Sequence, residues 1–452
     1  MIVASALFMQ NMDSTVIATA LPTMARAFHE EPVRMNVALT SYLLSLAVFI
    51  PASGWIADRF GAKNVFRIAI AVFTLGSVLC GAAATLPELV VFRILQGMGG
   101  AMMVPVGRLL LLKNVPRSEM VAVMAWLTTP ALIGPVVGPP LGGFITTYFS
   151  WRWVFDINVP IGIVGILLVT FLIEDVREDT DTPFDWTGFV LSGVAMGALM
   201  FGMETVGRSV LAAFVPAAAI GLGLLACAGY WLHARRHAAP LLDFSLMRFR
   251  TFQVAVNSGS AFRIGVGAMP FLMPMMLQLA FGASAVQSGL ITFATSAGAL
   301  VMKPVATRVI REFGFRRTLV VNGVFSAILL GLCGALRPSW PLAAIYAVLL
   351  AGGFLRSLQF TAYNVLAYGE VSRARMSAAT SLYSTLQQVF LTLGVTVGAA
   401  LLTLSMHFSG HAAPEISDFS ASFITVGLIS ATAVPLAMLM PANAAADLAP
   451  RR

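Results

Sequence analysis

Long apolar runs recur along the whole 452-residue chain. Crossing the ~30 Å hydrocarbon core of a bilayer takes about 20 mainly apolar residues in a helix. In lipid, every backbone N–H and C=O must find its partner within the protein, and a helix satisfies them within one segment. Repeated runs of this length therefore predict an all-α integral membrane protein.

The runs predict fourteen transmembrane helices. The first lacks a basic segment ahead of it and contains Gln10, Asn11 and Asp13, so we expect a retained helix and not a cleaved signal peptide. The predicted ranges are 1–27, 36–57, 65–85, 88–113, 118–147, 153–173, 186–206, 209–232, 252–281, 286–311, 317–336, 340–368, 374–407 and 419–441.

The charge pattern favours a membrane over nucleic acid. Charged residues make up 11% of the chain and hydrophobic ones 58%, whereas soluble domains are nearer ~25% charged. The net charge of +8 comes from short basic clusters between apolar runs and not from a basic stripe, so no nucleic-acid partner is expected. Such clusters are typical of loops facing an anionic cytoplasmic leaflet.

Alternating helices would place most Arg and Lys residues in the loops on the side of the termini. The positive-inside rule therefore predicts a multi-pass protein of the bacterial cytoplasmic (inner) membrane with both termini cytoplasmic. The acidic stretch from Glu174 to Asp181 is an exception. Acidic residues contribute little to orientation, and we interpret the stretch as a solvated linker.

A short internal repeat predicts the domain organisation. Phe60-Gly61-Ala62-Lys63 follows the second helix, and Phe313-Gly314-Phe315-Arg316 follows the tenth. If a helix pair near 186–232 is an insertion, each copy follows the second helix of a six-helix half, as in transporters built from repeats. The predicted parts are an N-terminal bundle (1–173), an inserted pair with linkers (174–250) and a C-terminal bundle with a short tail (251–452).

Charged residues inside predicted membrane helices are candidates for function. Asp13 is the clearest such carboxylate, and Arg93 shares a helical face with Gln96. An arginine at the bilayer centre costs roughly 3 kcal/mol on insertion scales, so Arg93 should have partners. The alternatives are an Arg93 that snorkels to the interface and an Asp13 with a purely structural pairing.

Two further motifs are built on glycine. Gly134-Pro135-Val136-Val137-Gly138-Pro139-Pro140-Leu141-Gly142-Gly143 repeats glycine every four residues and predicts a groove for a neighbouring helix, bent at its prolines. In Gly54-Trp55-Ile56-Ala57-Asp58-Arg59-Phe60-Gly61-Ala62-Lys63, Gly54 allows close approach, Gly61 a tight turn, and Asp58 can accept from basic groups. Generic helix packing and an ordinary polar loop are the alternatives.

Together with Gln10-Asn11-Met12-Asp13-Ser14-Thr15, these motifs resemble the major facilitator superfamily, and more narrowly its fourteen-helix drug–proton antiporter branch of the EmrB/QacA type. The resemblance implies two six-helix bundles plus an inserted pair, and a proton gradient in place of a cofactor. It implies proton-coupling and substrate residues (Asp13, Asn11, Arg93, Gln96), a cytoplasmic gate (Gly54, Asp58, Arg59, Gly61, Lys63) and an antiporter-motif helix (Gly134, Pro135, Gly138, Gly142, Gly143).

The second half of the chain carries cations but no carboxylate within its predicted helices. Arg263, Lys303 and Arg356 could line a cavity for neutral or anionic amphiphiles, unless Lys303 lies near the cytoplasmic interface. The three cysteines lie in apolar runs and are predicted to be free thiols. Among the histidines, only His407 and His411 have a spacing that could suit a metal, and we expect them to be solvated, so no metal site is predicted.

We expect a secondary active transporter that exports small amphiphilic compounds in exchange for protons by alternating access. Its partners would be the substrate, protons and the lipid bilayer; a monomer is expected, and a periplasmic adaptor stays open. The alternative is a facilitator or proton symporter for a small polar metabolite. We do not expect an enzyme, because no P-loop and no catalytic constellation is visible.

Overall fold

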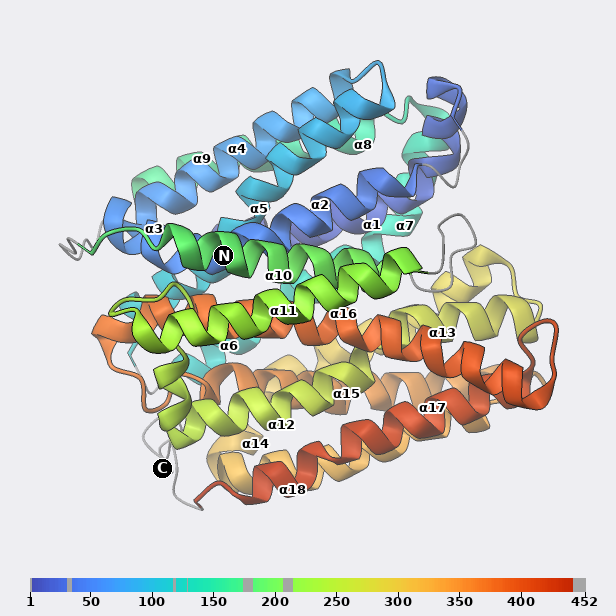
Figure 1. Ribbon diagram of the computed structural model, residues 1–452. Coiled ribbons are helices and arrows are strands. Elements are labelled where there is room, and N and C mark those ends of the chain that lie inside the picture. The colour runs from blue at the N-terminus through green and yellow to red at the C-terminus, as the bar shows by residue number, and fades with distance from the viewer. Residues whose placement is uncertain are drawn as a thin grey trace. The chain divides into compact units, whose positions relative to one another are not determined.

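The computed structural model describes residues 2–30, 35–116, 119–127, 129–173, 182–205 and 214–441. All regular structure in these ranges is helical, so the all-α prediction is confirmed (Figure 1). The acidic stretch 174–181 lies outside the described residues, and so do the last residues of the chain, 442–452.

The chain forms two compact units. The first unit comprises Met1–Asn114, Leu127–Phe244 and Ser372–Thr385, and the second comprises Val115–Trp126, Ser245–Val371 and Leu386–Arg452. Each unit thus includes a short segment from the half of the chain that otherwise belongs to the other unit.

Most helices of the first unit lie in the N-terminal half. They are α1 (Ile2–Phe28), α2 (Asn36–Phe49), the 3-10 turn η1 (Ile50–Ala52), α3 (Ser53–Phe60), α4 (Ala62–Ala82), α5 (Leu86–Asn114), α7 (Thr129–Tyr148), α8 (Trp153–Asp156), α9 (Asn158–Leu172), α10 (Trp186–Thr205) and α11 (Phe214–Arg236), followed by the start of α16 (Met376–Ser409).

The helices of the second unit follow, together with nearly all of α6 (Met120–Leu127) and the rest of α16. They are η3 (Phe244–Arg248), α12 (Arg250–Gly267), α13 (Met269–Met275), a π-helical turn (Met276–Ala280), α14 (Ala285–Leu332), η5 (Cys333–Ala335), α15 (Leu342–Leu366), α17 (Ile416–Ala431) and α18 (Ala433–Met438). The short turn η6 (Arg373–Arg375) precedes α16 in the first unit.

The predicted number of membrane spans is wrong. Within the described residues, 11 helices are long and apolar enough to cross a membrane, not fourteen. The helices predicted at 286–311 and 317–336 lie in the 48-residue element α14, on either side of a kink at Gly314, where the backbone is not helical. Two long helices, α1 and α7, are not among the 11.

The two copies of the predicted repeat share an unusual backbone conformation. Gly61 has φ 83° and Gly314 has φ 75°, a region that favours glycine because a Cβ atom would clash there. Gly61 separates α3 from α4, and Gly314 marks the kink inside α14. Glycine in each copy therefore permits the same local change of direction.

The helix pair α10 and α11 runs side by side (Figure 1), and α10 also packs on α2. Much of its remaining apolar surface is open, with Phe214 72% and Leu225 73% exposed. Exposed apolar surface on this scale is expected where lipid is the solvent. By contrast, the helices that carry the candidate site, α1, α4, α5 and α9, pack against one another.

Candidate functional site

A buried ion pair lies at the centre of the first unit. Nη1 of Arg93 on α5 lies 2.6 Å from Oδ2 of Asp13 on α1, and neither side chain is exposed to solvent. A charged pair shielded from water is stable only if its remaining donors and acceptors also find partners. The structure thus gives Arg93 the partner that its depth in the helix demands.

Three amide and hydroxyl side chains complete the network around the carboxylate. Nε2 of Gln96 donates to Oδ1 of Asp13 at 2.9 Å, and Nδ2 of Asn158 on α9 donates to the same oxygen at 3.0 Å. Both amides also donate to Oγ of Ser77 on α4, at 3.3 and 2.9 Å. Four helices therefore contribute to one hydrogen-bonded cluster, which we call the Asp13 network: Asp13, Arg93, Gln96, Asn158 and Ser77.

The guanidinium of Arg93 has a second set of contacts on α2. Its Nε donates to the carbonyl of Ala38 at 3.1 Å, and its Cζ lies 4.2 Å from the ring centroid of Tyr42, a cation–π geometry. Nη2 of Arg93, Oη of Tyr42 and Oδ1 of Asn158 are buried without a hydrogen-bond partner among the described residues. Unpartnered polar atoms at this depth are capable of binding a polar group of a ligand.

Local sequence explains why these side chains meet. Arg93 and Gln96 are three residues apart, so helix periodicity alone puts them on one face of α5. Glycines then bring the helices together: a Cβ at Gly76 would lie 2.8 Å from the backbone of Gln96, and one at Gly97 would lie 2.8 Å from the carbonyl of Tyr42. Close contact of α5 with α4 and α2 is therefore possible only without side chains there.

The glycine motif of α7 packs against α1 beside Asp13. A Cβ at Gly134 would lie 2.9 Å from the amide nitrogen of Met12, and one at Gly138 would collide with the side chain of Thr15. Gly142 is also buried, whereas a Cβ at Gly143 would meet nothing within 4 Å. Pro135 lies within α7, but the structure does not describe its side chain.

Asn11 has a more local contact than the other residues predicted for proton coupling. Its Nδ2 donates to the carbonyl of Leu7, one turn earlier in α1, at 2.8 Å, and the side chain is half-buried. By contrast, the side chains of Asp13, Arg93 and Gln96 form hydrogen bonds with one another.

The predicted gate residues gather around Asp58 at the end of α3. Oγ of Ser377 donates to Oδ2 of Asp58, and Nζ of Lys113 lies 3.6 Å from Oδ1. A Cβ at Gly54 would lie 2.8 Å from the carbonyl oxygen of Ser377. Arg59 is exposed and Lys63 half-buried. Ser377 and Lys113 are therefore partners of Asp58.

The three cations predicted for the second half lie in different surroundings. Arg356 lines a small cavity of the second unit together with Cys333, Thr295 and Ser326. Arg263 is 2% exposed and lies 6.0 Å from the ring centroid of Phe360, and Lys303 is 2% exposed. Of the three, only Arg356 is a lining residue of that cavity.

Sequence reasoning missed two clusters. Asn158 and Ser77 were not singled out, although a polar residue within an apolar run is a usable signal. His233 and His237, one helical turn apart, lie with Asp185 in a group that could bind metal, and the sequence analysis did not predict it.

His411 was expected to be solvated, yet its Nδ1 lies 2.7 Å from Oδ2 of the buried Asp418.

Known protein families and sequences show clear similarity to this chain. The model of the Major Facilitator Superfamily matches residues 3–247 and 256–451. A protein of Pectobacterium atrosepticum, provisionally named multidrug resistance protein MdtD, is 38% identical over 98% of this chain and 93% of its own. A protein of the same name from Serratia proteamaculans is 39% identical over 95% of this chain and 90% of its own.

Solved structures support the fold. The human organic anion transporter MFSD10 superposes with a TM-score of 0.69 at 12% identity, over 96% of this chain and 98% of that chain. The proton:xylose symporter XylE superposes with a TM-score of 0.66 at 15% identity, over 96% and 93%. At such low sequence identity, these two structures show that the fold is shared and nothing further.

Proposed function

Because the chain belongs to the major facilitator superfamily, and is therefore a multi-pass membrane transporter, we propose that it exports small amphiphilic compounds of the multidrug type in exchange for protons. The names of the relatives from Pectobacterium and Serratia support this class of substrate. We further propose that it works in the bacterial cytoplasmic membrane with both termini cytoplasmic, as the positive-inside pattern predicts.

The observation that carries the proposal is the buried ion pair of Asp13 and Arg93. A proton that binds to Asp13 removes its negative charge and so weakens the attraction that holds Arg93. An inward proton releases ~2.3 kcal/mol per 100 mV of membrane potential and ~1.4 kcal/mol per unit of pH difference. Opening and closing of this pair is the step at which that energy enters the cycle.

Competition between proton and cargo follows from the same geometry. With Asp13 ionised, its two oxygens accept from Arg93, Gln96 and Asn158 and the network is closed to solvent. Protonation frees donors on these side chains, next to the unpartnered Nη2 of Arg93 and Oη of Tyr42. A state with a neutral Asp13 therefore offers different polar contacts from a state with a charged one, as an exchange mechanism requires.

Asp58 is proposed as a latch of the cytoplasmic gate. Its carboxylate is held by Ser377 at the start of α16 and approached by Lys113 at the end of α5. These contacts join elements that are far apart in the chain, so a change of conformation can break them.

The decisive experiment is transport in proteoliposomes with an imposed pH gradient, using a fluorescent amphiphile as cargo. We expect Asp13→Asn to abolish gradient-driven efflux and to leave counterflow without a gradient measurable. Asp243→Asn is the matched control, since Asp243 is a partly exposed aspartate of the same unit that pairs with Arg375 at 2.6 Å. Gradient-driven efflux that survives Asp13→Asn would remove the coupling role of this residue.

A facilitator or symporter for a polar metabolite is the second candidate. The observation in its favour is a polar cluster in the second unit, where Asn322 donates to Gln359 at 2.7 Å and Gln359 donates to Tyr363 at 3.3 Å. These side chains already bond one another between α14 and α15, which suits a structural role. Net uptake driven by an inward proton gradient would favour this candidate over export.

A further inference from the structure

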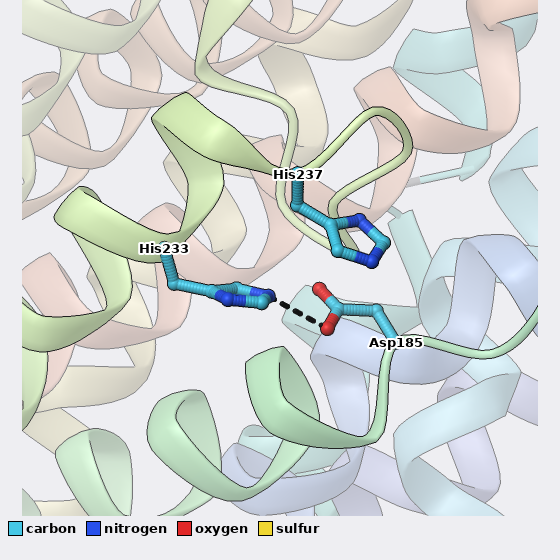
Figure 2. A group of neighbouring side chains, drawn as sticks. All are labelled: Asp185, His233 and His237. Carbon is cyan, nitrogen blue, oxygen red and sulfur yellow. Dashed lines mark hydrogen bonds and ion pairs between the residues drawn. The ribbon is translucent and has the colours of Figure 1, made fainter.

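A second polar cluster of the first unit lies outside the Asp13 network. Figure 2 shows the side chains of Asp185, His233 and His237 pointing toward one another from two segments of the chain. One potential ligand atom from each residue lies within 4.8 Å of the other two. Asp185 is 3% exposed, and both histidines are half-buried.

Local structure places each member. Asp185 directly precedes α10, and its Oδ1 accepts from the backbone N–H of Gly188 at 2.8 Å, so it caps that helix. His233 lies in the last turn of α11 and His237 just after it; the four-residue spacing puts both rings on one face. Nε2 of His233 lies 2.7 Å from Oδ1 of Asp185.

We propose that Asp185, His233 and His237 bind a divalent transition-metal ion of the zinc class. Two imidazoles and one carboxylate are a set that Zn²⁺ accepts, at ~2.0–2.2 Å from each atom. Tetrahedral bonds of that length separate two ligand atoms by about 3.3 Å. The His233–Asp185 contact has to widen slightly and His237 has to move inward, both within the reach of side-chain rotation.

Protonation sets the conditions for binding. A metal takes neutral imidazole and ionised carboxylate, so the nitrogen of His233 that faces Asp185 must lose its proton when the metal enters. On His237, Nδ1 accepts a long hydrogen bond of 3.3 Å from the N–H of Ala239. The Cζ atom of Arg235, between the two histidines in the chain, lies 3.6 Å from the ring centroid of Trp231.

The bound metal joins the start of α10 to the end of α11. The two helices already pack along their length, and the linker after α11 returns to the same point, where the N–H of Leu241 donates to Oδ2 of Asp185 at 3.4 Å. With three protein ligands, the fourth position stays open to water, as in exchangeable zinc sites. We therefore expect reversible binding that stabilises this end of the helix pair.

The test is titration of the purified full chain in detergent with ZnCl₂ by calorimetry at neutral pH, after treatment with a chelator and without a polyhistidine tag. Absorption of bound Co²⁺ in the visible range reports the coordination directly. The variants are His233→Gln and His237→Gln, and the control is His407→Gln, an exposed histidine elsewhere in the chain. His237→Gln is the preferred variant, because it leaves in place the cap that Asp185 forms on α10.

We expect one Zn²⁺ per chain, with affinity reduced more than about 10-fold in both histidine variants and unchanged in the control. Zinc should also raise the unfolding temperature of the wild type but not of His237→Gln. Absence of stoichiometric binding by the wild type would overturn the proposal, and so would full affinity in His237→Gln. Neither result depends on transport, so the proposed function is judged separately.

Discussion

Arg93 and Asp13 are 80 positions apart in the chain, yet Nη1 of the arginine donates a 2.6 Å hydrogen bond to Oδ2 of the aspartate and neither side chain is exposed. Each charge is costly in this environment without the other. The pair therefore stabilises the first unit only while both charges are present.

The first prediction concerns the coupling between the two charges. Removal of one partner of a buried pair costs about 3–5 kcal/mol, because the other charge is left uncompensated. Asp13→Asn and Arg93→Gln should each lower the free energy of unfolding in detergent strongly, and the double variant should be less destabilised than the sum. Additivity of the two effects within ~0.5 kcal/mol would show that the pair is not coupled.

Asn158 should matter although it carries no charge. Asn158→Leu removes one donor to Asp13 and one to Ser77, so that Gln96 alone of the two amides still donates to them. The loss costs about 1–3 kcal/mol in the free energy of unfolding, because one of the lost hydrogen bonds is to a charged group. Thr170→Val on the same helix is the control, since Oγ1 of Thr170 donates only to Ile166 within α9. Gradient-driven efflux should fall in the first variant and persist in the second; equal behaviour of the two would contradict the role assigned to Asn158.

The glycine motif allows a comparison of one substitution at two positions of α7. Gly134→Ala places a methyl group 2.9 Å from the backbone nitrogen of Met12, and so should push α7 away from α1 at a cost of about 1–3 kcal/mol. Gly143→Ala places its methyl group in open space and should be neutral. Thermal unfolding and efflux assays on both variants decide this. A tolerated Gly134→Ala would mean that α1 and α7 can separate freely.

His411 predicts a pH dependence. A hydrogen bond to Asp418, helped by the nearby Glu415, raises the pKa of His411 above its usual value. The protonated ring is favoured in the folded state, so its stabilising effect is complete below the unfolded-state pKa of ~6.5 and is lost as the pH rises through the folded-state pKa.

The measurement is the unfolding temperature of the wild type and of His411→Ala as a function of pH. The difference between the two should be largest in mildly acidic solution and should vanish at alkaline pH. His407→Ala, at an exposed position, should follow the wild type throughout. A difference that grows with rising pH would show that the sign of the linkage is wrong.

The membrane class, the family and the central pair of residues were predictable from the sequence. Apolar runs identify lipid as the solvent, and helix periodicity alone puts Arg93 and Gln96 on one face. The number of spans was mispredicted: 11 helices of the described residues qualify as spans, and the two helices predicted at 286–311 and 317–336 lie in one element, α14, which is kinked at Gly314. Local patterns detect apolarity well, but where one helix ends depends on its neighbours.

The sequence by itself determined which residue types had to be sheltered: a carboxylate at position 13 and a cation at position 93 within apolar helices demand partners in any fold. Only the tertiary structure decided who those partners are, that Asn158 and Ser77 join them, that Ser377 meets Asp58, and that Asp185 meets two histidines. The physical reason is range. Spacing within a helix follows from 3.6 residues per turn, whereas contacts between helices depend on which faces pack together, and here glycines on several helices set that packing.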